Sequence, residues 1–293
     1  MLRRSFLAGS AATLACARGS QGRGGGAGRS FMARRAAHPT RLLRRGPAPG
    51  SWQPQRVPAG ARALVYRSGA RELKAWFAAP AGGGPAPGLV YFHGEFSLAT
   101  WDFEQVRGFL DAGFAVLTPS LRGENGNPGD FELLRGELDD ACAAVRWLAA
   151  QPGVDPTRIS TVGHSVGGGL SALLALVPEL PLVATASVDG IYTPATFARW
   201  AADADTRDLV RFDPHDREET ELRVLGPHLA GLVRPHHAIV GSEDTSILRN
   251  ARALAERAPA LGAPFTLQVV PGDHSTSLQP ALQAHLAALR ARS

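Results

Sequence analysis

The chain has few residues of the kinds that crosslink proteins or hold metal ions. It contains two cysteines, Cys16 and Cys142, among 293 residues, so a framework of disulfide bonds is excluded. Its sequence has no C-x-x-C or H-x-x-H spacing, and we predict no metal ion and no other cofactor. Cys142 lies in DDACAAVRWL, on the apolar side of a predicted helix, which indicates a buried structural thiol.

Acidic residues are absent from positions 1–60, which hold eleven arginines and no lysine. Residues 61–293 carry the other 20 basic residues and all 26 acidic ones, so their formal net charge is −6. The charge of +5 on the whole chain therefore comes from its beginning. We expect no nucleic acid to bind residues 61–293, whereas the Arg/Gly-rich beginning alone has the composition of a weak RNA binder.

Residues 1–17 have the layout of an export signal. Arg3 and Arg4 precede a short apolar run, and RRSFL resembles the twin-arginine signal, which predicts a periplasmic or secreted protein. The alternative is a cytoplasmic protein whose translation starts at Met32. The apolar run is too short for a stable membrane span. Residues 18–60 are rich in Arg, Gly and Pro, and we predict that they are disordered.

Short apolar runs alternate with segments of helical spacing over residues 61–293. ARALVYRSGARELKAWFAAP predicts a hairpin that turns at Ser68-Gly69. Asp130 is expected to cap a helix over FELLRGELDDACAAVRWLAAQ. Continuous apolar runs such as GLVYFHG and LVATASV indicate strands that are buried on both faces. The pattern predicts one α/β domain with a mostly parallel central sheet flanked by helices.

Several glycines surround one serine in VGHSVGGG. Gly163-His164-Ser165-Val166-Gly167 is the pattern G-x-S-x-G, and it lies between an apolar strand and an apolar helix. A serine at a sharp strand-to-helix turn has a strained backbone, and larger neighbours would collide with the adjacent strand or helix. In this context the pattern predicts that Ser165 is a nucleophile. The alternative is a glycine-rich turn with a bystander serine.

A serine hydroxyl is a poor nucleophile and needs a base. The candidate base is His274, which lies in PGDHST directly after the last predicted strand. Asp244, in IVGSEDT after the preceding strand, is the candidate carboxylate that orients the base. Its neighbour Glu243 is expected to be a surface acid, and Asp189, after LVATASV, is the second candidate. The resulting order along the chain is Ser, Asp, His.

Acyl transfer also needs two backbone N–H groups that bind the developing oxyanion. We expect one from Val166, which follows the serine. The other is expected from Glu95 in the loop after GLVYFHG, with Phe96 as the alternative. His93 in the same loop is interpreted as a loop-stabilising residue.

The chain resembles the α/β-hydrolases, and within them the catalytic domains of prolyl oligopeptidases and the dienelactone-hydrolase-like enzymes. The resemblance rests on these stretches: YFHGEF (91–96), TPSLRGENGNPGDFE (118–132), VDPTRISTVGHSVGG (154–168), VGSEDT (240–245) and PGDHS (271–275). It implies an α/β-hydrolase fold over residues 61–293 and cofactor-independent serine hydrolysis.

The same resemblance implies a small cap at about residues 190–235. The candidate walls of the substrate pocket are then Phe96, Tyr192 and Trp200. For the two cap residues, Tyr192 and Trp200, the alternative is that they only pack the cap onto the sheet. We expect a small ester as substrate, with a short peptide as the alternative. A non-catalytic binding module on the same fold is the remaining alternative. The oligomeric state does not follow from the sequence.

Overall fold

The computed structural model describes residues 30–49, 55–82 and 84–291 of the chain. The predicted export signal, residues 1–17, lies outside these ranges. Among the described residues, no helix is long and apolar enough to cross a membrane.

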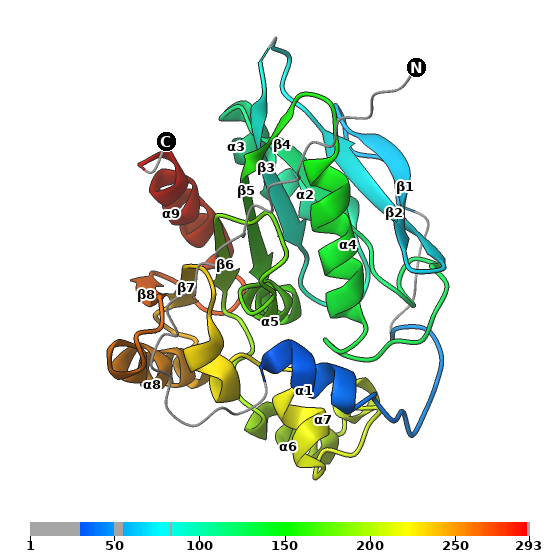
Figure 1. The fold of residues 1–293 in the computed structure, drawn as a ribbon, viewed down its shortest axis with the longest axis vertical. Helices are drawn as coiled ribbons and strands as arrows, with labels where there is room; N and C mark the ends of the chain where they lie inside the picture. Colours follow the sequence, from blue (N-terminus) through cyan, green and yellow to red (C-terminus); the bar gives the residue numbers. More distant parts are fainter. Residues whose placement is uncertain (1–29, 50–54, 83, 292–293) are drawn as a thin grey trace, which may run out of the picture.

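The centre of the molecule is an eight-stranded sheet (Figure 1) in the order β1-β2-β4-β3-β5-β6-β7-β8. The strands from β4 to β8 in this order run parallel, and β1 and β2 are antiparallel to their neighbours. The predicted α/β fold is therefore confirmed. The strands are β1 (Arg62–Ser68), β2 (Arg71–Ala78), β3 (Ala86–Phe92), β4 (Ala115–Pro119), β5 (Val154–His164), β6 (Ala184–Val188), β7 (His236–Gly241) and β8 (Phe265–Val270).

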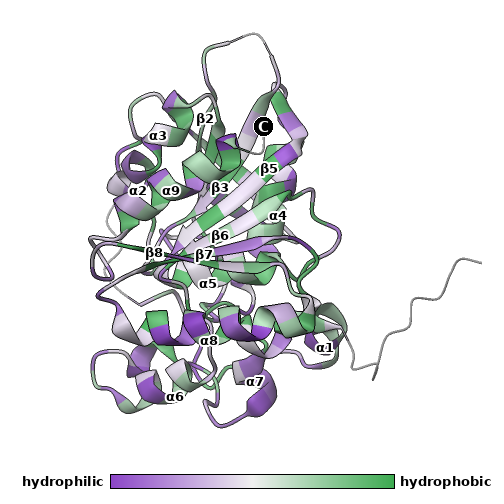
Figure 2. Cartoon of the chain, turned by 90° about the vertical axis from the view of Figure 1, so that its left-hand side faces the viewer, coloured by the Kyte–Doolittle hydropathy of each residue, from purple (hydrophilic) through white to green (hydrophobic). Residues whose placement is uncertain are grey.

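Helices cover both faces of the sheet, and the core consists of two apolar clusters, one under each set of helices. The larger cluster lies under α4 (Glu137–Ala149), α5 (Ser165–Leu174) and α8 (Thr245–Leu261). The smaller lies under α2 (Thr100–Gln105), α3 (Arg107–Asp111) and α9 (Leu278–Arg290). Strands β4 and β6 are buried along their whole length, as expected of strands that are covered on both faces. Figure 2 shows polar residues facing outward on the helices that surround this core.

The predicted hairpin is confirmed. Strands β1 and β2 pair from Arg62 opposite Phe77 to Ser68 opposite Arg71. Gly69 lies in the turn between them with φ of +59°, a conformation that glycine adopts at little cost. Because β2 also pairs with β4, the hairpin extends the parallel sheet at one edge.

The prediction of disorder over residues 18–60 is wrong for residues 30–49. Helix α1 (Phe31–Ala37) lies beside α7 (Arg217–Glu221), in the same group of helices as α6 (Ala195–Ala202) (Figure 1). Phe31 is buried, and its ring packs edge-on against His228. Arg34 forms ion pairs of 2.8 and 2.9 Å with Glu218 and Glu221. Arg35, Arg44 and Arg45 likewise pair with acidic residues far away in the sequence, which a local composition does not reveal.

The helix predicted after Asp130 begins later than expected, at Glu137. Leu133 and Leu134 have positive φ angles and break the helix before it. Asp130 accepts hydrogen bonds from the Gly46 N–H and the Arg45 side chain instead of capping the helix. The contacts with the segment 30–49 therefore compete with local capping and prevail.

The expected cap region lies between β6 and β7. Residues 190–235 contain α6, η1 (Arg207–Leu209), α7 and η2 (Gly226–Gly231). Helix α1 adds a further helix to this group from the other end of the chain (Figure 1). The group at one end of the molecule is thus built from two segments that are distant in sequence.

Candidate active site

Ser165 stands at the junction of β5 and α5, with a backbone φ of +54°. The backbone around Ser165 leaves no room for a side chain at the positions of the neighbouring glycines. A Cβ atom on Gly163 would lie 2.1 Å from the carbonyl oxygen of Gly167, and one on Gly167 would lie 2.2 Å from that of Phe92. The tight strand-to-helix turn expected from G-x-S-x-G is therefore present, and it holds the serine in a strained conformation at the carboxyl end of the sheet.

Three of the predicted residues form one hydrogen-bonded chain. The Oγ atom of Ser165 lies 3.0 Å from Nε2 of His274. The Nδ1 atom of His274 lies 2.6 Å from Oδ2 of Asp244. The carboxylate is largely buried and the imidazole is 43% exposed, so a substrate can reach the serine and the histidine but not the aspartate.

Asp244 and Asp189 have different partners although both follow a strand of the sheet. Asp244 begins α8, where its Oδ1 accepts the N–H of Ile247, and its other oxygen faces His274. Asp189 is fully buried, and it accepts the N–H of Gly241 and the hydroxyl of Ser277. Burial raises the pKa of Asp189. Of the two candidates, Asp244 is the one hydrogen-bonded to the histidine, and Glu243 is exposed as expected.

Two residues near the serine, His164 and Ser277, were given no role in the site by sequence reasoning. His164 directly precedes Ser165, and its Nε2 donates to the backbone carbonyl of His274 over 2.8 Å. Burial lowers the pKa of His164 to about 4, so the ring is neutral near pH 7. Asp189 and Ser277 join the ends of β6 and β7 to the start of α9. Both contacts position the loop that carries His274, and no local motif marks them.

The loop after β3 lies against the serine. A Cβ atom on Gly94 would lie 2.9 Å from Nδ1 of His164 and 3.6 Å from the Cβ of Ser165, so a side chain there would force His164 to shift. Glu95 has a φ of +59°, which is uncommon for a residue with a side chain. The structure thus brings the backbone of Gly94 and Glu95 beside Ser165 and Val166, where the two N–H donors are expected.

The three predicted pocket residues lie in different environments. Phe96 lines a small pocket with Val166, and its ring packs edge-on against Phe131. Tyr192 is fully buried and hydrogen-bonds to Ser187, so it is a core residue and its assignment to the pocket wall is wrong. Trp200 is half-buried on α6 and packs against Phe197.

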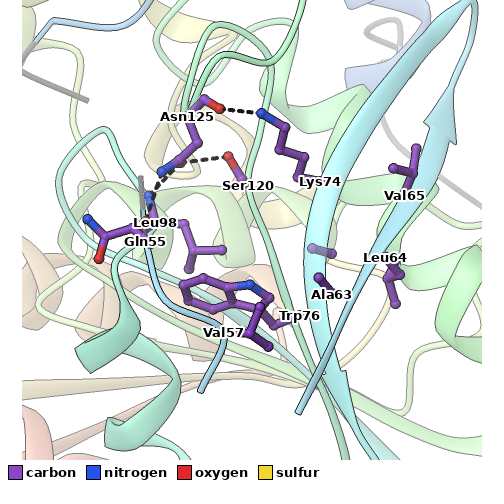
Figure 3. Close-up of a pocket in the computed structure, with 11 residues that line it drawn as sticks. Gln55, Val57, Ala63, Leu64, Val65, Lys74, Trp76, Leu98, Ser120 and Asn125 are labelled. Atoms are coloured by element: carbon purple, nitrogen blue, oxygen red, sulfur yellow. Dashed lines mark hydrogen bonds between the residues drawn. The ribbon is translucent and has the colours of Figure 1, made fainter. Parts of the chain in front are cut away.

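A larger cavity of about 420 Å³ lies away from the serine, between the β1–β2 hairpin and Leu98 (Figure 3). Trp76 forms part of its apolar wall. The polar residues of this cavity bond to Asn125. The ammonium group of Lys74 donates to the backbone carbonyl of Asn125 over 2.7 Å. The side-chain oxygen of Asn125 accepts hydrogen bonds from the Ser120 hydroxyl and from the Leu98 N–H. Asn125 therefore ties the loop after β4 to the loop after β3 that carries Glu95.

One group of side chains in the described residues could hold a metal ion by distance alone. His164, Asp189 and His274 each place a nitrogen or oxygen atom within 4.8 Å of the others. The hydrogen bonds of these side chains are already used to position the loop with His274 and to contact Ser165. The arrangement accounts for these three residues without a metal ion.

The fold and the site define the class of protein, an α/β-hydrolase. The sequence model of the X-Pro dipeptidyl-peptidase (S15) family matches residues 49–202, and a model of the alpha/beta hydrolase fold matches residues 134–275. The chain belongs to the α/β-hydrolase superfamily and, by the longer match, to its X-Pro dipeptidyl-peptidase (S15) family.

Known proteins similar to the chain differ in their named activities. An uncharacterized protein of Mycobacterium tuberculosis is 30% identical over 145 residues, which cover 47% of this chain and 51% of that protein. The chain therefore spans about half the length of the curated relatives it matches. A puromycin-hydrolyzing peptidase of M. tuberculosis superposes with a TM-score of 0.68 at 21% identity, covering 78% of this chain and 39% of the peptidase. An esterase of Pyrobaculum calidifontis superposes with a TM-score of 0.65 at 16% identity, covering 80% of this chain and 86% of the esterase. Both structural likenesses show the fold alone.

Proposed function

We propose that the chain is a serine hydrolase that cleaves small carboxylic esters by acyl transfer. The observation that carries the proposal is the hydrogen-bonded chain from Ser165 through His274 to Asp244 at a strained strand-to-helix turn. In this order the three groups can act as nucleophile, general base and orienting carboxylate. A binding module would have no need to keep a strained serine in contact with a base.

The proposed reaction has two halves. The Oγ of Ser165 attacks the carbonyl carbon while Nε2 of His274 takes its proton, and the same nitrogen then protonates the leaving alcohol. The N–H groups of Val166 and Glu95 bind the negative oxygen of the tetrahedral intermediate. A water molecule, activated by His274, then attacks the acyl-enzyme and releases the acid. Asp244 holds the ring with Nδ1 protonated, so that Nε2 faces the serine.

Peptide cleavage is the second candidate, and the match of residues 49–202 to the X-Pro dipeptidyl-peptidase family favours it. The same residues would act in the same order. We place esters first because an alcohol leaves more readily than an amine, so an ester demands less of His274 as a general acid. The half-exposed His274 also leaves the site open to small substrates.

A comparison of matched substrates tests both candidates. We expect the full chain to hydrolyse p-nitrophenyl esters of short acids, and to do so faster than aminoacyl p-nitroanilides. Ser165→Ala should abolish both activities if they share the site. Faster cleavage of the anilides would replace the ester proposal by the peptide one, and an inactive but folded wild type would favour a binding module.

A further inference from the structure

His93 is a fully buried side chain that contacts the loop beside the serine. It follows β3, and its two ring nitrogens face different oxygen atoms. Nδ1 lies 2.8 Å from the carbonyl oxygen of Gly94, and Nε2 lies 3.1 Å from Oε2 of Glu124. The same oxygen of Glu124 accepts the backbone N–H of Leu121 over 2.8 Å. The histidine therefore joins the loop after β3 to the loop after β4.

The partners of His93 determine where its protons lie. A carbonyl oxygen only accepts hydrogen bonds, so Nδ1 of His93 must carry a proton. Nε2 faces a carboxylate, which favours a second proton on the ring. Although burial alone would lower the pKa of His93, the charge and hydrogen bond of Glu124 raise it to about 9. Both nitrogens are then donors near pH 7, and the ring is a buried cation paired with Glu124.

The bond to Gly94 fixes the direction of another group. The carbonyl of Gly94 and the N–H of Glu95 belong to one planar trans peptide and point in opposite directions. When the Nδ1–H of His93 holds the oxygen on one side, the N–H of Glu95 is held on the other. The positive φ of Glu95 is a strained conformation, and such strain persists only where surrounding contacts enforce it.

We propose that His93, held in place by Glu124, is a positioning residue for the oxyanion site: it fixes and polarises the Gly94–Glu95 peptide so that the Glu95 N–H meets the developing charge. The proposal rests on the proposed function, because the Glu95 N–H matters only if an oxyanion forms. A hydrogen bond from a cation to the carbonyl draws electron density through the peptide and makes its N–H a stronger donor. In this role His93 acts through the Gly94–Glu95 peptide and not on the reacting atoms.

The charges around His93 agree with this role. Glu124 faces it from the loop after β4, and Asp102 lies near it on α2. Burial raises the pKa of Asp102 to about 6, so this carboxylate is ionised above neutral pH and favours the charged ring. The exposed carboxylate of Glu95 lies near Asp102. Since the pKa of His93 is raised, its charge is kept below about pH 9 and lost above it.

Substitutions of His93 by asparagine and by glutamine distinguish a hydrogen-bonding role of the side chain from a role in packing alone. The amide of asparagine reaches the place of Nδ1, whereas the amide of glutamine reaches the place of Nε2. His93→Asn can still donate to the Gly94 carbonyl, but His93→Gln can bond only toward Glu124. Loss of one oxyanion donor lowers kcat by about 100-fold to 1,000-fold in a serine hydrolase. We expect His93→Gln to lose about 100-fold in kcat with little change in KM, and His93→Asn to lose less than about tenfold.

The experiment uses the full chain and measures kcat, KM and melting temperature with a p-nitrophenyl ester. His228 serves as a control, since it is also buried and one of its nitrogens is hydrogen-bonded to a backbone carbonyl, that of Glu221. His228→Gln should leave kcat within about twofold. A folded His93→Gln variant with wild-type kcat, or equal kcat in His93→Gln and His93→Asn, would overturn the proposal. Inactivity of the wild type would instead contradict the proposed function.

Discussion

Two aspartates beside the site show how a single residue type takes different roles. Asp244 bonds to His274, and Asp189 bonds to Gly241 and Ser277. We predict that Asp244→Asn lowers kcat by about 10⁴-fold, because an amide favours the wrong tautomer of the imidazole. The fold should survive, since asparagine is as good as aspartate at a helix N-cap. Steady-state kinetics with a melting curve check both statements.

Asp189→Asn should behave differently. The variant is expected to lower the melting temperature, because the buried Ser277 hydroxyl and Gly241 N–H then face an altered acceptor. Its kcat should stay much closer to that of the wild type than the kcat of Asp244→Asn. An inactive but stable Asp189→Asn variant would move the orienting carboxylate from Asp244 to Asp189.

Glu137 gives a prediction about pH. It lines the small pocket with Phe96, and its Oε2 has no hydrogen-bond partner among the described residues. Burial raises its pKa to about 7. The folded chain therefore holds this proton more tightly than the unfolded chain, and the stabilisation is complete below the ordinary pKa and is lost as the pH rises through 7. We expect this effect to lower the free energy of unfolding by up to about 3 kcal/mol between pH 4.5 and 7.5.

Denaturant unfolding of Glu137→Gln checks this prediction, because glutamine cannot titrate. The variant should have a flatter dependence of unfolding free energy on pH over the same range than the wild type. Identical pH profiles for the two proteins would show that Glu137 does not hold a raised pKa.

At the level of single residues, the sequence identified the three residues of the candidate site better than the residues that position them. Ser165, His274 and Asp244 each follow an apolar strand in a recognisable loop, and all three meet in the structure. His164 and Ser277 support them through contacts between segments that are distant along the chain, so no spacing reveals them. Tyr192 was misplaced because an aromatic residue after a strand can face either the pocket or the core.

At the scale of elements, helix α1 is the part of the fold that the composition concealed. Phe31 is 6% exposed and packs against His228, although its segment is rich in arginine. We predict that Phe31→Ala lowers the free energy of unfolding by about 3 kcal/mol, the usual cost for a buried aromatic ring. Leu43→Ala in the same segment is the control, because Leu43 is 67% exposed. Equal stability of the two variants would mean that α1 is not held against the molecule.

The same contrast explains which elements could be predicted. Strands β3 and β6 are continuous apolar runs, and their signal is local. The start of α4 depends on Asp130 bonding to Gly46 and on the strained backbone of Leu133 and Leu134. The contact between Asp130 and Gly46 joins residues that are far apart in the sequence, and local helix signals do not contain it.

At the scale of the whole molecule, the segment 30–49 and the residues 190–235 form one group of helices beside the sheet (Figure 1). A fragment that begins at residue 61 would lose this contact, so activity measurements belong on the full chain. The site also depends on several loops at one edge of the sheet, from β3, β4, β5, β7 and β8. Its geometry is therefore a property of the complete fold.

The most direct test of the central claim is covalent labelling of the full chain with a fluorophosphonate, followed by mapping of the labelled peptide. An activated serine attacks phosphorus as it attacks a carbonyl carbon, and the phosphonyl oxygen then occupies the oxyanion site. The account predicts a single label on Ser165 that is absent from Ser165→Ala and strongly reduced in His274→Ala. A folded wild-type chain that takes up no label, or a label on another residue that persists in Ser165→Ala, would contradict it.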